Sequence, residues 1–188
     1  MDNKVVFNEL AATWDERCKH DFVKIQQIIN LSGIKPQAKI LDVGTGTGIL
    51  LNFLLKKYPF KITALDYAEK MIECAKKKHQ DPRIEFVTQD IMQHDEKEYD
   101  YIFLYSVYPH FEDKEQLMRH LAFKLKTGGK LIIAHSQSKE KVNSIHQNRL
   151  FKNAILEAAS ITVTTMQDFF QVETVIDTDE MYYISATK

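Results

Sequence analysis

Short β-rich runs alternate with helical segments over most of this 188-residue chain, and this order limits the fold more than any other feature. Five runs are predicted to be strands: Lys39–Val43, Lys61–Leu65, Ile84–Thr88, Tyr99–Tyr105 and Leu131–Ala134. They are nearly all apolar, which is typical of strands that are covered on both faces. Alternation of this kind favours a doubly wound, mostly parallel sheet with helices on both faces. The predicted fold class is therefore α/β.

Helical periodicity marks the segments between these strands. Apolar residues recur at i, i+3, i+4 and i+7 in Ala68–His79 and again in Lys114–Lys126. Asp113 begins a capping-box pattern before the second of these helices. The pair Gly128-Gly129 is expected to end that helix.

The last third of the chain has a different pattern. We expect a long helix over about Ser138–Ala159 and a short helix or turn near Val163–Asp168. Two further strands, Phe169–Ile176 and Met181–Ala186, are separated by a short polar stretch, which predicts a hairpin.

Composition limits the class of protein. The chain is 44% hydrophobic and 27% charged, as in ordinary soluble domains, and its net charge of −1 gives no attraction to nucleic acid or anionic membranes. Cys18 and Cys74 do not make a disulfide framework, and the N-terminus has no apolar stretch typical of a signal peptide. We expect one cytoplasmic domain over residues 1–188, with a helical segment over 1–36 and the core over 37–188.

Three of the six glycines lie in the stretch ILDVGTGTGIL, where Gly44, Gly46 and Gly48 follow a predicted buried strand. Glycine permits positive φ and lets a ligand approach the backbone, and the start of the expected next helix offers free N–H groups. The alternative is a tight turn without a ligand. Ile49 stands where the nicotinamide fingerprint G-x-G-x-x-G needs its third glycine, and the P-loop pattern is absent.

The run from Asp42 to Gly48, DVGTGTG, resembles motif I of the class I S-adenosylmethionine-dependent methyltransferases. The resemblance continues in order. YDYIFLYSVYPHF corresponds to the family's fourth strand and active-site loop, and LKTGGKLIIAHS is similar to its L-K-P-G-G-x-L element, with Thr127 in place of proline. The resemblance covers residues 36–188 and implies a Rossmann-like, seven-stranded sheet with a C-terminal antiparallel hairpin.

The resemblance also implies S-adenosylmethionine as the cofactor, bound at the carboxyl edge of the sheet. Asp42 then steers its ammonium group, Asp66 accepts from the ribose hydroxyls, and Asp90 accepts from the adenine amine beside the backbone of Ile91. Tyr67 is placed where it could lie against adenine. The alternatives are that Asp66 caps the next helix, that Asp90 is a turn residue, and that Tyr67 only packs. The candidate cofactor-binding residues are Asp42, Gly44, Thr45, Gly46, Gly48, Asp66, Tyr67, Asp90, Ile91 and Tyr105.

The segment VFNELAATWDERCKHDF resembles the lead-in of methyltransferases of the menaquinone and ubiquinone type. In that group, an aromatic residue followed by Asp precedes the core and helps to close the site, which here corresponds to Trp14-Asp15. Phe7 and Trp14 are thus candidate lid residues. The alternative is that they fasten the N-terminal helices to the sheet.

Three histidines fall where this fold would place an acceptor pocket. The candidate catalytic residues are His110 after the fourth strand, His135 at the end of the fifth, and His146 on the following helix, with Asn143 one turn earlier on the same face. The alternative for each is a histidine satisfied by backbone or water.

A soft-metal site that combines these histidines with Cys18 and His20 is a further alternative. No pair has recognisable zinc-ligand spacing, so no metal is predicted.

The sequence therefore predicts methyl transfer by in-line displacement from S-adenosylmethionine to O, N, S or C of a small-molecule acceptor. The alternative is a non-catalytic cofactor-binding or partner-docking module with the same fold, and an oxidoreductase is weakened by the glycine spacing. The loop at residues 106–110, SVYPH, lacks the [DNS]-P-P-[YFW] motif of adenine and glutamine methyltransferases, which argues against a nucleic-acid acceptor. The sequence does not indicate the acceptor or the oligomeric state.

Overall fold

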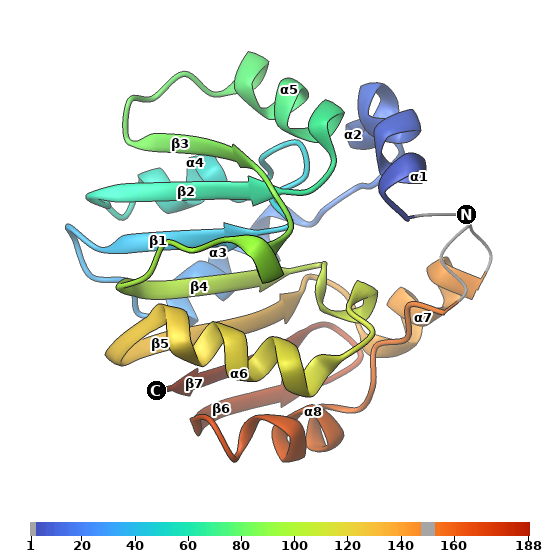
Figure 1. The fold of residues 1–188 in the computed structure, drawn as a ribbon. Helices are drawn as coiled ribbons and strands as arrows, with labels where there is room; N and C mark the ends of the chain where they lie inside the picture. The colour runs from blue at the N-terminus through green and yellow to red at the C-terminus, as the bar shows by residue number, and fades with distance from the viewer. Residues whose placement is uncertain (1–2, 148–152) are drawn as a thin grey trace. The chain divides into compact units, whose positions relative to one another are not determined.

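The computed structural model describes residues 3–147 and 153–188. The chain forms two compact parts, residues up to Asp95 and residues from Glu96 onward, and we describe each part by itself. Figure 1 shows the elements of both parts along the chain.

The first part contains three parallel strands in the order β3-β2-β1. These are β1 (Lys39–Val43), β2 (Lys61–Asp66) and β3 (Ile84–Thr88). The side chains of β1 and β2 are buried apart from the first residue of each strand, because both faces of these strands are covered. Because β1 and β2 are parallel, their carboxyl ends lie at the same edge of the sheet, and the glycine loop begins at the end of β1.

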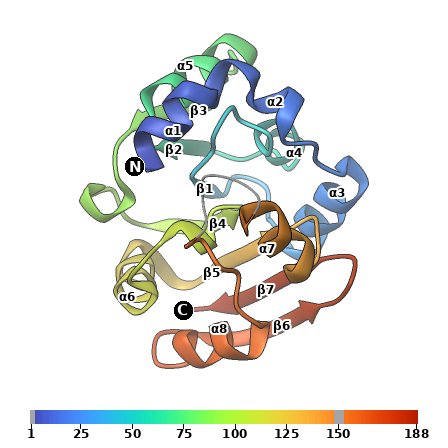
Figure 2. The same cartoon turned by 90° about the vertical axis from the view of Figure 1, so that its right-hand side faces the viewer.

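Helices cover both faces of these three strands, with α5 on one face and α3 and α4 on the other (Figures 1 and 2). Asp21 caps α3 by accepting from the backbone N–H groups of Val23 and Lys24. The helical elements of this part are α1 (Asn3–Leu10), η1 (Ala11–Thr13), α2 (Trp14–Arg17), α3 (Phe22–Leu31), α4 (Leu51–Leu55), α5 (Glu69–Lys78) and η2 (Ile91–Gln93).

The second part contains four strands in the order β4-β5-β7-β6. β4 and β5 are parallel, β7 is antiparallel to both β5 and β6, and α6 and α8 pack against each other. Its elements are β4 (Tyr99–Tyr105), η3 (Tyr108–His110), α6 (Lys114–Lys124), β5 (Leu125–His135), α7 (Lys139–Gln147), α8 (Ala159–Met166), β6 (Gln171–Asp177) and β7 (Tyr182–Thr187).

The predicted fold class is confirmed. The seven strands form a mostly parallel, Rossmann-like sheet that ends in an antiparallel hairpin, β6 and β7. The five predicted parallel strands are all present, and so are the helices within the first 36 residues. The alternation of apolar runs and helical periods was sufficient to predict the fold class, because these patterns show which residues are buried.

Two predicted helix ends are wrong. The helix that begins at Lys114 ends at Lys124, because β5 already starts at Leu125 and pairs with Tyr99 of β4. Gly128 and Gly129 therefore lie within a strand and do not stop the helix. The apolar side chain of Leu125 fits either a helix or a buried strand, so periodicity alone could not decide its state.

The long helix predicted over Ser138–Ala159 is also wrong. α7 is helical from Lys139 to Gln147, residues 148–152 lie outside the described part, and residues 153–158 are not helical. The backbone at Leu156 instead hydrogen-bonds the side chain of Asn143, so this segment lies alongside α7. A new helix, α8, starts at Ala159, and its first N–H donates to Asp177.

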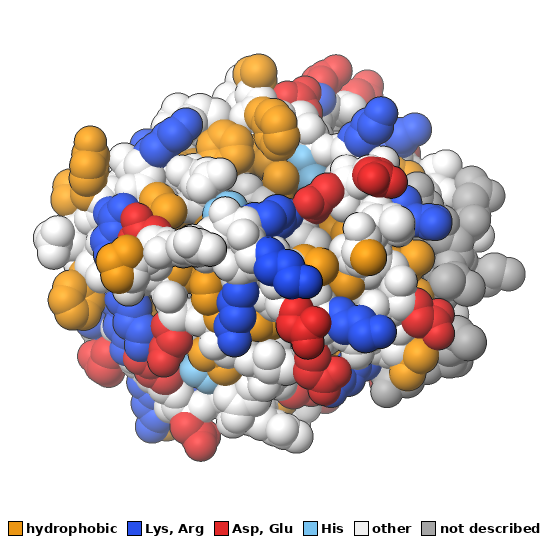
Figure 3. All heavy atoms as spheres, turned by 90° about the horizontal axis from the view of Figure 1, so that it is seen from above, with side chains coloured by type: hydrophobic (Ala, Val, Ile, Leu, Met, Phe, Trp, Pro, Cys, Tyr) orange, Lys and Arg blue, Asp and Glu red, His pale blue; other side chains and the backbone are white. Residues whose placement is uncertain are grey.

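On the face drawn in Figure 3, lysine and arginine side chains are interspersed with aspartate and glutamate. This agrees with the balanced composition of the chain. Every helix in the described ranges is too short or too polar to cross a bilayer.

Candidate functional site

The glycine loop follows β1 directly and owes its path to three left-handed residues. Gly44, Gly46 and Gly48 have φ values of 67°, 56° and 90°. The helix that was expected to open at these glycines starts only at Leu51, so the loop is a turn and not a helix terminus. The reason is conformational, because positive φ is incompatible with a right-handed helix. The loop amides are used locally, and the N–H of Thr45 donates to Leu65 at 3.0 Å.

Asp66, at the end of β2, ties this loop to the start of α5. Its Oδ2 accepts from the backbone N–H of Gly46 and its Oδ1 from that of Ala68, both at 2.9 Å. The N-cap position of α5 is Ala68, which gives no side-chain cap, so Asp66 precedes the helix and does not cap it. Burial raises the pKa of Asp66 to about 6, although the backbone donors counteract this effect. A third backbone N–H, that of Tyr67, also donates to this carboxylate, so one of its four lone pairs remains for a ligand hydroxyl.

Asp42 is a second buried carboxyl group beside the loop. Its Oδ2 accepts from the Thr45 hydroxyl at 2.7 Å, and only 2% of the residue is exposed. Burial raises the pKa of Asp42 to about 7, and the negative charge of Asp66 contributes to the rise. A nearby cationic group would favour the ionised form of such a carboxyl group.

Asp90 lies at the end of β3, as predicted. It is exposed, and its Oδ1 accepts from the N–H of Met92 at 2.9 Å, so that Asp90 caps the short helix η2. Asp90 can therefore cap η2 through one carboxylate oxygen and still offer the other oxygen to a ligand. Ile91 is buried directly after it.

The N-terminal helices pack on α5 through aromatic rings. Phe7 makes edge contacts with Trp14 at 5.5 Å and with Tyr67 at 6.2 Å between ring centroids. These rings surround a small buried cluster that includes Ala11 and Met71. Phe7 and Trp14 therefore pack the N-terminal helices against Tyr67 and α5, and Trp14 lies next to the position that a Cβ on Gly46 would take.

A polar contact joins the same segment to the glycine loop, and its partners could not be inferred from the sequence. The Thr47 hydroxyl donates to Asp15, whose other oxygen forms an ion pair with Lys78 at 2.7 Å. Burial alone would raise the pKa of Asp15, but the hydrogen bonds from Lys78 and Thr47 outweigh it and lower that pKa. Each of the three residues is more than 30 positions from the other two in the sequence, so no local sequence pattern connects them.

Replacing Gly48 with Ala is expected to destabilise the protein more than replacing Gly33 with Ala. Both glycines have positive φ, but a Cβ on Gly33 would meet no atom within 4 Å. A Cβ on Gly48 would lie 2.8 Å from the ring of His79 and 2.9 Å from Leu51. Strain costs about 1–2 kcal/mol at each position, and crowding adds about 1 kcal/mol or more at Gly48. Urea unfolding of both variants measures the difference, and equal losses would contradict the close approach of His79.

The carboxyl ends of β4 and β5 meet in the second part of the chain. The Tyr105 hydroxyl donates to the Ser136 hydroxyl at 2.8 Å, and both residues are buried. Ser106 has a φ of 56°, an uncommon value for a residue with a side chain, and its N–H donates to Ala134 at 2.9 Å. Strained residues of this kind often occur at functional sites.

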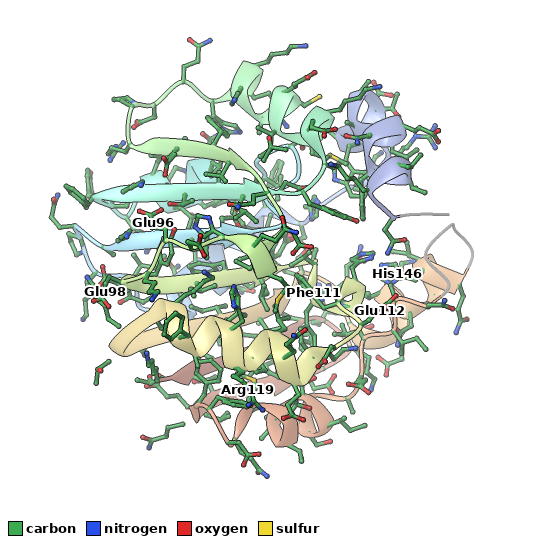
Figure 4. All side chains as sticks on the ribbon, in the orientation of Figure 1. Glu96, Glu98, Phe111, Glu112, Arg119 and His146 are labelled. Carbon is green, nitrogen blue, oxygen red and sulfur yellow. The ribbon has the colours of Figure 1, made fainter. Side chains whose placement is uncertain are left out.

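His110 and His146 lie together in this part, with ring centroids 5.1 Å apart (Figure 4, where His146 is labelled). Burial lowers the pKa of His110 to about 3, and the neighbouring His146 contributes to the effect. His146 is partly buried, and its Nδ1 contacts the carbonyl oxygen of Ala154. His110 is thus a neutral ring at physiological pH.

His135, the third predicted catalytic histidine, is only 2% exposed. It ends β5 and packs edge-on against the ring of Tyr182 at 6.0 Å. This burial leaves little side-chain surface for an acceptor. In the described residues, no group of three or more His, Cys, Asp or Glu side chains is arranged to hold a metal ion.

Comparison with known proteins agrees with this arrangement. Residues 40–129 match a family described as a methyltransferase domain. Malonyl-[acyl-carrier protein] O-methyltransferase 1 of Ilyobacter polytropus is 29% identical over 190 residues, which is 95% of this chain and 69% of that protein. Demethylmenaquinone methyltransferase of Thermotoga maritima is 34% identical over 98 residues, 50% of this chain and 42% of that protein. The chain therefore spans about two thirds of the first relative and less than half of the second.

Among solved structures, one described as an S-adenosyl-L-methionine-dependent methyltransferase from Methanococcus maripaludis superposes with a TM-score of 0.72. It is 25% identical, and the match covers 96% of this chain and 93% of that one. The matched family, the relatives and the fold agree with the motif order noted in the sequence. The matched domain, the relatives and the fold support an S-adenosylmethionine-dependent methyltransferase, whose cofactor is S-adenosylmethionine.

Proposed function

We propose that this enzyme methylates a hydroxyl oxygen of a small-molecule acceptor. The observation that carries the proposal is the pair of histidine rings, His110 and His146, in the part of the chain where β4 and β5 end. A hydroxyl group must lose its proton during methyl transfer, and histidine is the usual proton acceptor near neutral pH. The name of another relative, ubiquinone biosynthesis O-methyltransferase of Coxiella burnetii, supports an oxygen acceptor.

The residues of the first part fit the proposed cofactor. Asp66 retains a lone pair for a ribose hydroxyl, and Asp90 has a carboxylate oxygen for the adenine amine. Asp42 is a buried carboxyl group whose charged form a cation would stabilise, which suits the ammonium end of the cofactor. We assign these three roles to Asp42, Asp66 and Asp90, with the glycine loop against the methionyl part.

The bound cofactor supplies an electrophilic methyl group on a sulfonium sulfur. In the proposed reaction the acceptor oxygen forms the new C–O bond while the S–CH3 bond breaks, and the electron pair of that bond stays on sulfur. The hydroxyl proton passes to a histidine of the pair, so the charge lost at sulfur appears on the imidazole. The protein mainly has to hold the two reactants in line at near-attack distance.

The proposal has two further parts. Tyr105 is proposed as a further cofactor-binding residue, and its hydroxyl donates to the Ser136 hydroxyl. A cytoplasmic location is supported by Cys18 and Cys74, which are both free thiols.

Replacing His146 with Ala is expected to lower turnover by about 100-fold and to leave cofactor affinity within about threefold. General acid–base catalysis contributes at least this much, and His146 does not belong to the cofactor-binding part of the chain. Calorimetry with S-adenosylhomocysteine measures affinity. Transfer of a labelled methyl group to a panel of phenols, alcohols, thiols and carboxylic acids measures turnover. His120→Ala on α6 is the matched histidine control and should change neither quantity.

The same panel of acceptor compounds distinguishes methylation of a hydroxyl group from methylation of another group and from a non-catalytic module. Methyl ethers as the main products would support it, whereas methyl esters or thioethers would move the acceptor to another class. Saturable binding of S-adenosylhomocysteine without turnover on any compound would favour the cofactor-binding, partner-docking module.

A further inference from the structure

The side chain of Asn143 on α7 holds the backbone at Leu156 by two hydrogen bonds. Its Nδ2 donates to the carbonyl of Leu156 at 2.9 Å, and its Oδ1 accepts from the N–H of the same residue at 2.8 Å. An amide side chain that pairs with both polar groups of one backbone residue fixes the position and direction of that residue. Leu156 is only 1% exposed, so its own side chain anchors the segment as well.

Ala154 lies two residues before Leu156, and its carbonyl oxygen contacts Nδ1 of His146. A carbonyl oxygen can only accept a hydrogen bond, so Nδ1 must carry the proton. In the neutral ring the basic lone pair is then on Nε2. Asn143 and His146 are three residues apart on α7 and so share one face of that helix, and one backbone segment contacts both side chains.

The two histidines of the pair differ in their surroundings. Nδ1 of His110 is buried, whereas Nδ1 of His146 contacts the carbonyl oxygen of Ala154, which would stabilise an added positive charge. Two imidazolium rings 5.1 Å apart would repel each other, so only one of them is expected to take up a proton. The polar surroundings favour His146 for this role, and His110 then serves as its neutral neighbour.

We propose that Asn143 is a positioning residue, which presents the Ala154 carbonyl to His146 and thereby makes Nε2 of His146 the proton acceptor in methyl transfer. This inference rests on the proposed function. The acceptor O–H bond breaks, its proton goes to Nε2, and its electron pair forms the new bond to the methyl carbon. The carbonyl–imidazole–substrate order has the same logic as other histidine bases, whose second nitrogen is held by a backbone or carboxylate oxygen.

The first test is spectroscopic and needs no acceptor. Protein with 15N-labelled histidine should show His146 as the Nδ1–H tautomer, with a pyrrole-type Nδ1 and a pyridine-type Nε2 resonance. In Asn143→Ala the population of this tautomer should fall. Asn143→Asp keeps the acceptor for the Leu156 N–H and loses the donor, so we expect a population of the Nδ1–H tautomer between those of the parent protein and Asn143→Ala. It provides the measurement if Asn143→Ala folds poorly. Gln147→Ala removes an exposed amide from the same helix and is the matched control.

The second test is kinetic. Asn143→Ala should lower kcat by about 10- to 100-fold, with affinity for S-adenosylhomocysteine within about twofold, and it should have no further effect in a His146→Ala background. An Nε2–H tautomer in the unsubstituted protein would overturn the proposal, and so would a loss of kcat that is the same in both backgrounds. If no acceptor is methylated at all, the proposed function fails, whereas the tautomer measurement still decides the role of Asn143 in positioning the ring.

Discussion

Asp66→Asn is expected to weaken S-adenosylhomocysteine binding by about 100-fold or more. The carboxylate accepts from the N–H groups of Gly46, Tyr67 and Ala68 and offers its remaining lone pair to the ribose. Asparagine replaces one oxygen with an NH2 group, which would face a backbone donor and could not accept from a hydroxyl. Hydrogen bonds to charged groups contribute about 1.5–3 kcal/mol each, and 1.4 kcal/mol is tenfold in affinity.

Calorimetric titration of purified protein measures this change. Asp95→Asn is a suitable control, because Asp95 is exposed in the same part of the chain. Circular dichroism checks that the Asp66 variant remains folded. An affinity within threefold of the parent protein would remove Asp66 from the cofactor site.

Cofactor affinity is expected to increase as the pH rises from about 5.5 to 8, by up to about tenfold per pH unit for one proton. In the ligand-free protein, burial raises the pKa of Asp42 to about 7 and that of Asp66 to about 6. Below these values the carboxyl groups are protonated and cannot attract the ammonium group. Binding of a cation lowers the pKa of Asp42 again, so that uptake of the cofactor releases a proton.

Calorimetry at several pH values, in two buffers of different ionisation enthalpy, measures the released proton directly. Asp42→Asn should abolish most of the release and flatten the pH dependence. Proton release that is unchanged in this variant would show that another group titrates.

The same two pKa values predict how the stability of the ligand-free protein changes with pH. Both pKa values lie above the ordinary 3.8, so this stabilising contribution is complete below about pH 4 and is lost as the pH rises through 6 and 7. Each unit of pKa corresponds to about 1.4 kcal/mol, so the total is several kcal/mol. S-adenosylhomocysteine should reverse the loss, because it compensates the buried charge.

The aspartates that the sequence predicted near the ends of the first three strands are found there in the structure. Asp42 and Asp66 lie on β1 and β2, Asp90 lies two residues after the end of β3, and the glycines between Val43 and Ile49 have the positive φ that was expected. The hairpin of β6 and β7 also follows its polar turn. These features depend on local patterns of apolar and polar residues, and burial imposes such patterns on any chain of this fold class.

The tertiary structure decided which distant groups meet and which titratable groups are buried. Asp15 bonds to Thr47, His79 lies against Gly48, and Asn143 fixes the backbone at Leu156, although no local pattern relates these positions. The sequence offered His110, His135 and His146 as catalytic candidates, whereas burial makes the ring of His110 a poor proton acceptor. The physical reason is that hydrophobic periodicity reports the burial of residues that are close together in the sequence. Hydrogen-bond partners and desolvation instead depend on distant segments, which only folding brings together.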